Sequence, residues 1–327
     1  MKTKTSSVFL IFLLLIGSLA GCSGEEEVKK DRMKVGVMLS DVGLGDQSFS
    51  DAAFAGLVKA RDELGIFFDY RELQTSGTYE KGLTELVEAG NDIVVGLGFM
   101  VVEDLEKVAK KYPKQKFILI DSVSEMENIT SITFKEEQGS FLAGAIAGMV
   151  SKTNKVGFIG GADVPLIRKF KSGFEQGAKA VNPNAEIKVV YANDFGNADL
   201  GAGIAADMIA DGADVLYAAA GLTGVGVLQE AQQEKKYAIG VDSDQYFFAE
   251  KAVVTSMLKN IDVALYETIK EFANEEKLAS GPIELGMTEN GVGLAPIRVI
   301  KLSEEQNGKL QDLEAKLSNN EISIRVE

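Results

Sequence analysis

The sequence predicts an α/β protein with two doubly wound, parallel-sheet lobes joined by a hinge. Three observations support this prediction. Short apolar runs alternate with helical patterns, and this alternation occurs twice along the chain. The body that follows the N-terminal segment has about 300 residues, which is more than one ordinary hydrophobic core holds.

The N-terminal segment is typical of a lipoprotein signal peptide. Lys2 and Lys4 precede an apolar run at 8–16, which is shorter than the roughly 20 residues of a membrane-spanning helix. The tetrapeptide Leu-Ala-Gly-Cys then ends at Cys22 and resembles a lipobox, in which the cysteine is acylated. We therefore expect a signal peptide over 1–21 and a lipid anchor at Cys22, on the extracytoplasmic face of the cell membrane or in a periplasm. The alternative is an ordinary signal peptide with an incidental cysteine.

The segment 22–32 is polar and charged, with no apolar period, and this composition is typical of a flexible tether. Cys22 is the single cysteine of the chain, so we expect no disulfide within the mature protein. A lone thiol at this position is consistent with lipid attachment.

Charge and composition exclude several classes of function. The chain has 34 Lys+Arg against 49 Asp+Glu, a net charge of −15, and removing the two lysines of segment 1–21 leaves −17. Such a surface repels nucleic acid, so we expect no nucleic-acid partner. The absence of histidine excludes Ser-His and Cys-His catalysis and removes the commonest transition-metal ligand. We expect no enzymatic activity, no cofactor and no metal; hydrolysis by carboxylates alone stays as an alternative.

The chain repeats itself in order and spacing. The distance from Gly36 to Asp121 equals that from Gly157 to Asp242, 85 residues in each case. Around these positions, four short segments recur in the same order: Lys34-Val35-Gly36-Val37-Met38 as Lys155-Val156-Gly157-Phe158-Ile159, Phe54 and Lys59-Ala60 as Phe174 and Lys179-Ala180, Gly90 to Val94 as Gly212 to Leu216, and Lys116 to Ser122 as Lys236 to Ser243. Four matches at a nearly constant offset predict two similar halves.

Each half alternates buried strands with helices. In the first half, continuous apolar runs predict strands at 34–39, 93–97 and 117–120. Apolar residues at helical spacing predict a helix over 49–64, and Ser48 with Asp51 resembles a capping box at its start.

The second half repeats the alternation. We expect strands at 155–159, 187–191, 215–218 and 238–241, and helices at 167–181, 198–209 and 224–234. Near the C-terminus we expect an exposed helix over 303–317 and a short edge strand over 322–326. Because chains of this architecture cross between lobes more than once, we assign 33–153 plus about 258–285 to the first lobe and 154–257 plus about 286–327 to the second.

Aspartates follow the predicted strands at the edge where such sheets bind ligands. Asp41 follows the first strand, Asp121 follows the strand at 117–120, and Asp242 is the counterpart of Asp121 in the second half. Ligands of doubly wound sheets bind beyond the carboxyl ends of the strands, so the repeat predicts carboxylates on two facing lobes. The alternative for each is an ordinary turn or helix cap.

Several motifs resemble the basic membrane lipoprotein family of importer receptors, also described as PnrA-like nucleoside-binding lipoproteins. They include Gly45-Asp46-Gln47-Ser48-Phe49-Ser50-Asp51, Phe141-Leu142-Ala143-Gly144, Lys171-Ser172-Gly173-Phe174, Gly221-Leu222-Thr223-Gly224-Val225-Gly226 and Thr255-Ser256-Met257-Leu258-Lys259-Asn260-Ile261-Asp262. The resemblance extends from about Lys34 to Leu294, and Ser50 stands where the family usually has Asn. It implies a type I periplasmic-binding-protein-like fold, a nucleoside ligand between the lobes and the permease subunits of an ABC transporter as partners.

The resemblance also implies which residues contact the ligand: Asp41, Phe49, Asp121, Gly221, Asp242 and Lys259. Phe49 offers a flat face for a base, a contact worth about 1–3 kcal/mol, and Phe170 or Phe195 is a candidate for the other face. A carboxylate suits the two hydroxyls of a ribose, a role we assign to Asp242, while Asp121 accepts from the base. Lys259 then donates to the ribose or holds Asp242 in place.

Each of these assignments has a simpler alternative. Phe49 also fits the apolar stripe of its own helix, Lys259 also fits a surface lysine at a helix start, and Gly221 also fits a tight turn. The excess of carboxylates argues against nucleotides, because it repels phosphate. We therefore favour a neutral nucleoside, with a purine first. A ligand-sensing regulatory lipoprotein, a sugar receptor and a carboxylate-dependent nucleoside hydrolase are the other candidate functions.

Overall fold

The computed structural model describes residues 32–275, 277–279 and 281–327. The expected signal peptide, the lipid site at Cys22 and all but the last residue of the expected tether lie outside these residues. Within the described residues, no helix has the length and apolarity needed to cross a membrane.

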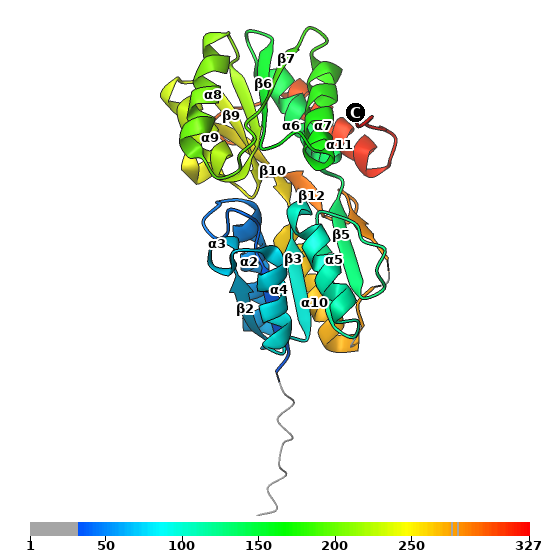
Figure 1. Cartoon of the computed structure of the whole chain (residues 1–327). Helices are drawn as coiled ribbons and strands as arrows, with labels where there is room; N and C mark the ends of the chain where they lie inside the picture. The colour runs from blue at the N-terminus through cyan, green and yellow to red at the C-terminus, as the bar shows by residue number, and fades with distance from the viewer. Residues whose placement is uncertain (1–31, 276, 280) are drawn as a thin grey trace, which may run out of the picture. The chain divides into compact units, whose positions relative to one another are not determined.

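The body from Met33 to Glu327 contains two six-stranded sheets (Figure 1). The first has the order β11-β5-β4-β3-β1-β2, and all its neighbouring strands run parallel. Its strands are β1 (Lys34–Met38), β2 (Phe67–Arg71), β3 (Ile93–Leu97), β4 (Lys116–Ile120), β5 (Ile129–Phe134) and β11 (Ile283–Leu285). Its helices are α2 (Phe49–Leu64), α3 (Leu73–Ser76), α4 (Tyr79–Glu88), α5 (Val102–Lys111) and α10 (Ile261–Glu275), with a short 3₁₀ turn η1 (Phe99–Val101).

The second sheet repeats this plan with the order β12-β10-β9-β8-β6-β7. Its strands are β6 (Lys155–Gly160), β7 (Glu186–Tyr191), β8 (Val215–Ala219), β9 (Tyr237–Asp242), β10 (Val253–Lys259) and β12 (Val292–Leu294). Only β12 runs antiparallel to its neighbour. Its helices are α6 (Glu136–Val150), α7 (Pro165–Val181), α8 (Ala198–Ala210), α9 (Gly221–Gln233) and α11 (Glu304–Ser318), with η2 (Tyr246–Phe248).

The central strands are buried because helices cover both faces of each sheet. All five residues of β3 and of β8 are buried. This explains why the sequence shows continuous apolar runs there rather than an alternating pattern. The identical strand order of the two sheets confirms the predicted pair of doubly wound lobes.

Helix α6 belongs to the second lobe, which corrects the expected boundary at residue 153. It packs against α7 and also contacts β10, β12 and α11. The close approach of α6 to α7 requires glycine: a Cβ on Gly144 would lie 2.0 Å from the carbonyl oxygen of Phe174, and one on Gly177 would lie 1.9 Å from that of Phe141. The repeat in the sequence begins at β6, so it did not reveal that the chain had already crossed before α6.

The described chain crosses between the lobes at three places: before α6, between β10 and α10, and between β11 and β12. The crossing segments are hydrogen bonded to one another. The amide of Asn260 donates to the carbonyl of Gly291 (2.9 Å), and the amide of Lys135 donates to the carbonyl of Leu285 (2.9 Å). These three segments form the hinge.

Two local expectations were wrong. The described residues 322–326 form no strand. The Ser48 side chain does not cap α2, because the carboxylate of Asp46 accepts the amide hydrogens of Ser48, Ser50 and Asp51 instead (3.0, 2.7 and 3.2 Å). The hydroxyl of Ser48 is therefore free to bond elsewhere.

Candidate ligand-binding site

A cavity lies between the carboxyl edges of the two sheets. It encloses about 640 Å³, open solvent included. Its wall is mainly apolar and aromatic. All eight residues predicted to contact ligand line it: Asp41, Phe49, Asp121, Phe170, Phe195, Gly221, Asp242 and Lys259. The structure therefore brings together side chains that are up to 218 positions apart, from Asp41 to Lys259.

Asp121 and Asp242 occupy equivalent places in the two lobes. Asp121 directly follows β4, and Asp242 is the last residue of β9. Both have left-handed backbones, with φ of 68° and 63°. An aspartate tolerates this conformation better than most residues, and at the end of a strand it turns the side chain toward the cavity.

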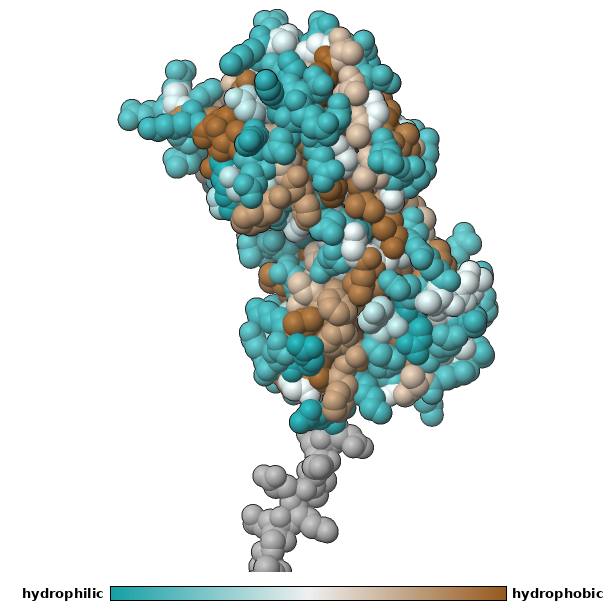
Figure 2. All heavy atoms as spheres, turned by 90° about the vertical axis from the view of Figure 1, so that its left-hand side faces the viewer, coloured by the Kyte–Doolittle hydropathy of each residue, from teal (hydrophilic) through white to brown (hydrophobic). Residues whose placement is uncertain are grey.

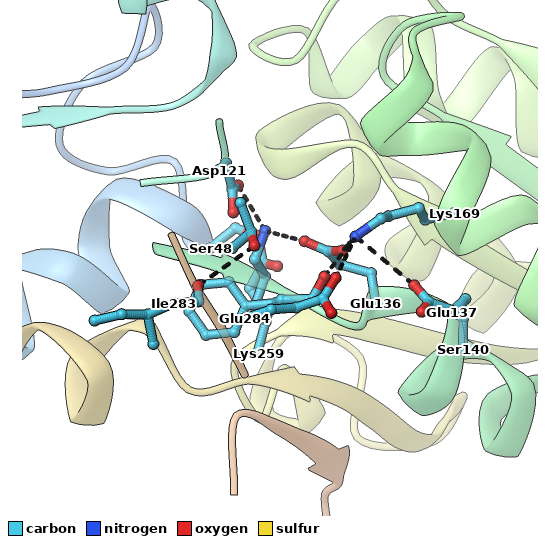
Figure 3. Close-up of polar contacts among 12 residues, drawn as sticks. Ser48, Asp121, Glu136, Glu137, Ser140, Lys169, Lys259, Ile283 and Glu284 are labelled. Atoms are coloured by element: carbon cyan, nitrogen blue, oxygen red, sulfur yellow. Dashed lines mark hydrogen bonds and ion pairs between the residues drawn. The ribbon is translucent and has the colours of Figure 1, made fainter. Parts of the chain in front are cut away.

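Lys259, the last residue of β10, is held by two carboxylates. Its Nζ lies 2.6 Å from Oδ2 of Asp121 and 3.1 Å from Oε1 of Glu136, and its side chain is 2% exposed. Figure 3 shows this nitrogen between the two acids. The expected alternative of a surface lysine is therefore wrong. The expected support of Asp242 by Lys259 is also not observed, because the ammonium bonds Asp121 of the first lobe.

Glu136 extends this contact into a partly buried charge network. Its other oxygen, Oε2, lies 3.2 Å from Nζ of Lys169, which also donates to the carbonyl of Phe134 (2.7 Å). Glu137 and Glu284 lie 3.9 Å from the same nitrogen (Figure 3). Sequence reasoning missed Glu136 and Lys169. The signal was an acidic pair at the start of the otherwise apolar segment 136–150.

Burial and charge shift the pKa values of this cluster. Burial raises the pKa of the Asp121 carboxyl, and the nearby Lys259 ammonium opposes the rise. Burial likewise raises the pKa of Asp242, against the effects of Lys259 and the bond from Ser48. For Lys259, burial lowers the pKa, but the carboxylates of Asp121, Glu136 and Asp242 outweigh it and raise the pKa above its ordinary value. The ammonium thus stays charged.

Asp242 is held by a residue of the opposite lobe. The hydroxyl of Ser48 donates to Oδ2 of Asp242 over 2.5 Å. Next to it, Nε2 of Gln245 donates to the carbonyl of Gln47 over 3.0 Å. Sequence reasoning assigned Ser48 to helix capping and missed Gln245, because neither capping motifs nor apolar periodicity shows which lobe a side chain faces.

Four phenylalanines line the cavity: Phe49, Phe99, Phe170 and Phe195. The ring centroids of Phe49 and Phe170 lie 5.4 and 5.6 Å from Nζ of Lys259. The ring of Phe195 can occupy its position only because residue 161 is glycine. A Cβ on Gly161 would lie 2.1 Å from a carbon of this ring. Phe99 was not predicted, although it follows a strand end in the same way as Asp41 and Asp121.

The described residues contain no group of three or more His, Cys, Asp or Glu side chains arranged to hold a metal ion. The cavity wall carries one lysine and four aspartates, Asp41, Asp46, Asp121 and Asp242, and this set suits a ligand that donates hydrogen bonds. The geometry therefore indicates a binding site for a small organic solute.

Comparison with known proteins identifies the class. The family model described as "ABC transporter substrate-binding protein PnrA-like" matches residues 33–327. The chain belongs to this family. PnrA-like membership gives it a solute-binding role and agrees with the resemblance found in the sequence.

Relatives of this PnrA-like protein include a "CD4+ T-cell-stimulating antigen" of Listeria innocua, 33% identical over 99% of both chains. Basic membrane protein B of Borreliella burgdorferi is 32% identical and covers 97% of this chain and 94% of its own. A solved structure of an ABC transporter solute-binding protein from Aeropyrum pernix is 27% identical, with a TM-score of 0.83 over 90% of this chain and 94% of that chain. The fold is thus of the type I periplasmic-binding-protein kind, and relatives carry names such as lipoprotein and basic membrane protein.

Proposed function

We propose that this PnrA-like protein captures a nucleoside, with purines favoured, in the interlobe cavity and delivers it to an ABC permease by hinge closure. The observation that carries the proposal is the pair of equivalent carboxylates, Asp121 and Asp242, on opposite sides of one aromatic-lined cavity. A nucleoside combines what this wall recognises: a flat base and a hydroxylated sugar.

The hydrogen-bonding capacity of the wall supports a ligand rich in donors. Within the described structure, Oδ1 of Asp121 is buried and has no hydrogen-bond partner. A buried, unsatisfied carboxylate oxygen costs free energy, and a ligand N–H or O–H would satisfy it. We assign this oxygen to the base, and the carboxylate of Asp242 to the ribose hydroxyls.

The aromatic side chains support a flat ligand. Phe49 comes from α2 of the first lobe, and Phe170 and Phe195 come from the second lobe, so a base has candidate faces on both sides. Stacking on such faces contributes about 1–3 kcal/mol per base.

The charge of the wall argues against nucleotides. The four aspartates of the wall outnumber the single ammonium of Lys259, and both Lys259 contacts already go to carboxylates. A phosphate would meet uncompensated negative charge. The proposal also includes acylation of Cys22 as the anchor that keeps the receptor beside its permease.

The test is calorimetric titration of the chain carrying Cys22→Ser, unfolded and refolded to remove retained ligand. The titrants are nucleosides, free bases, nucleotides and pentoses. We expect nucleosides to bind in the micromolar range or tighter and nucleotides not to bind. Asp242→Ala and Phe49→Ala should weaken binding, whereas the exposed controls Asp199→Ala and Phe247→Ala should not.

Two results would overturn the proposal. Binding of pentoses without binding of nucleosides would make the protein a sugar receptor. Release of free base during the titration, measured by chromatography, would make it a hydrolase.

A further inference from the structure

We propose that Ser48 and Gln245 form an interlobe latch that favours closure of the two lobes independently of the contacts made by solute. The latch consists of the hydrogen bond from Ser48 to Asp242 and that from Gln245 to the carbonyl of Gln47. It does not depend on which solute the cavity binds, and Ser48 acts in it as a positioning residue for Asp242.

Gln245 is built into the second lobe for this contact. It is 1% exposed, its backbone N–H donates to the hydroxyl of Ser256 (3.0 Å), and its side-chain Oε1 accepts from the backbone N–H of Val241 (3.0 Å). The bond from Val241 fixes the side chain, so that Nε2 points at the first lobe. A Cβ on Gly240 would lie only 2.8 Å from this side chain, so the strand leaves room for it.

The first lobe presents its half of the latch in a fixed orientation as well. Gln47 has a left-handed backbone, with φ of 57°, and its backbone N–H donates to the carboxylate of Asp51 (3.1 Å). Asp46 caps α2 and thereby leaves the Ser48 hydroxyl available for Asp242. Both halves of the latch are thus held before they meet, which lowers the entropic cost of closing it.

The lobes also meet on another side of the cavity. The side chain of Val42, in the first lobe, lies 3.4 Å from the place where a Cβ on Gly196 of the second lobe would stand. Because Asp242 lines the cavity and Ser48 holds one of its oxygens, closure by the latch also orients this carboxylate toward its ligand. A latch of this kind shifts the open–closed equilibrium without any contribution from solute.

The test measures the distance between the lobes without solute. Spin labels are placed at Gln74→Cys and Asp199→Cys, which are exposed and lie in different lobes, in the full chain carrying Cys22→Ser and stripped of ligand. Double electron–electron resonance should show a closed population at the short distance beside the open one. Ser48→Ala with Gln245→Glu should move the closed-to-open ratio toward open by about tenfold, as expected for the loss of two net hydrogen bonds.

Controls separate the latch from general loss of structure. Ser48→Thr keeps the hydroxyl and should restore the closed distance. Ser243→Ala removes a hydroxyl that makes no hydrogen bond within the described part of the chain and should change nothing. Ser48→Ala alone tests the idea if Gln245→Glu impairs folding. If the latch variants are folded by circular dichroism and keep the parent's distances, or if the parent shows no closed population, the inference is wrong.

Discussion

Asp121 and Asp242, at equivalent ends of β4 and β9, each accept a hydrogen bond from a residue that the opposite lobe supplies. Lys259 of β10 donates to Oδ2 of Asp121, and Ser48 at the start of α2 donates to Oδ2 of Asp242. Closing the lobes therefore brings a hydrogen-bond donor to each of the two carboxylates at the same time.

Asp121→Asn should weaken nucleoside binding more than it weakens folding. The amide keeps the shape of the side chain but removes the charge that Lys259 and the ligand share. Because hydrogen bonds to charged groups contribute about 1.5–3 kcal/mol, the dissociation constant should rise about 10- to 100-fold in calorimetry. An unchanged dissociation constant would remove Asp121 from the binding site.

Glu136→Gln should be strongly destabilising. Glu136 is fully buried and lies between the ammonium groups of Lys259 and Lys169, so its neutralisation leaves the buried Lys259 and the partly buried Lys169 undercompensated. Loss of one partner from a buried ion pair costs about 3–5 kcal/mol, measurable by urea unfolding. As a control, Lys316→Met removes the exposed Lys316–Asp312 pair and should leave the midpoint unchanged.

Asp46 should make stability rise as the pH falls through the mildly acidic range. Burial raises its pKa from 3.8 to about 6, although the backbone N–H groups that it caps oppose the rise. Because the pKa of Asp46 is higher in the folded protein than in the unfolded chain, its ionisation lowers the free energy of unfolding above pH 6. As the pH falls from 6 to 3.8, the folded protein takes up this proton first and the lost stability is recovered. Relative to Asp46→Asn, the parent should gain up to about 3 kcal/mol over this interval in urea unfolding. Parallel stability profiles of parent and variant would refute this assignment.

Gly161→Ala should displace Phe195 from the cavity wall. The added methyl would stand 2.1 Å from the ring, so the ring must move. We expect faster release of a bound nucleoside in stopped-flow measurements, with a loss of affinity of about tenfold, since base stacking on an aromatic ring is worth about 1–3 kcal/mol. In the control Gly203→Ala, the methyl meets no described atom within 4 Å, and affinity should stay the same.

The sequence was sufficient for the parts of the fold and site that depend on periodicity and on strand ends. The repeat predicted equivalent sheets, and the position of Asp121 and Asp242 after equivalent strands predicted that they face one cavity. These predictions succeed because ligands of a doubly wound sheet bind at one edge, beyond the carboxyl ends of its strands.

What the sequence did not show are relationships set by three-dimensional packing. The placement of α6 in the second lobe depends on glycine contacts with α7. The partner of Lys259 depends on where β10 ends relative to the first lobe. The role of Ser48 depends on the fact that Asp46, and not Ser48, accepts the backbone N–H groups at the start of α2. None of these has a period or spacing along the chain that would reveal it.

The three crossings at the hinge also govern the order in which the protein can be completed during synthesis. The edge strand β11 and the helix α10, which packs on α2, both belong to the first lobe but follow most of the second lobe in the chain. The first lobe thus lacks its last strand until residue 285 has been made. The second lobe in turn receives β12 and α11 only afterwards. Neither lobe is a continuous stretch of chain, so both sheets receive their last strands only within residues 283–294.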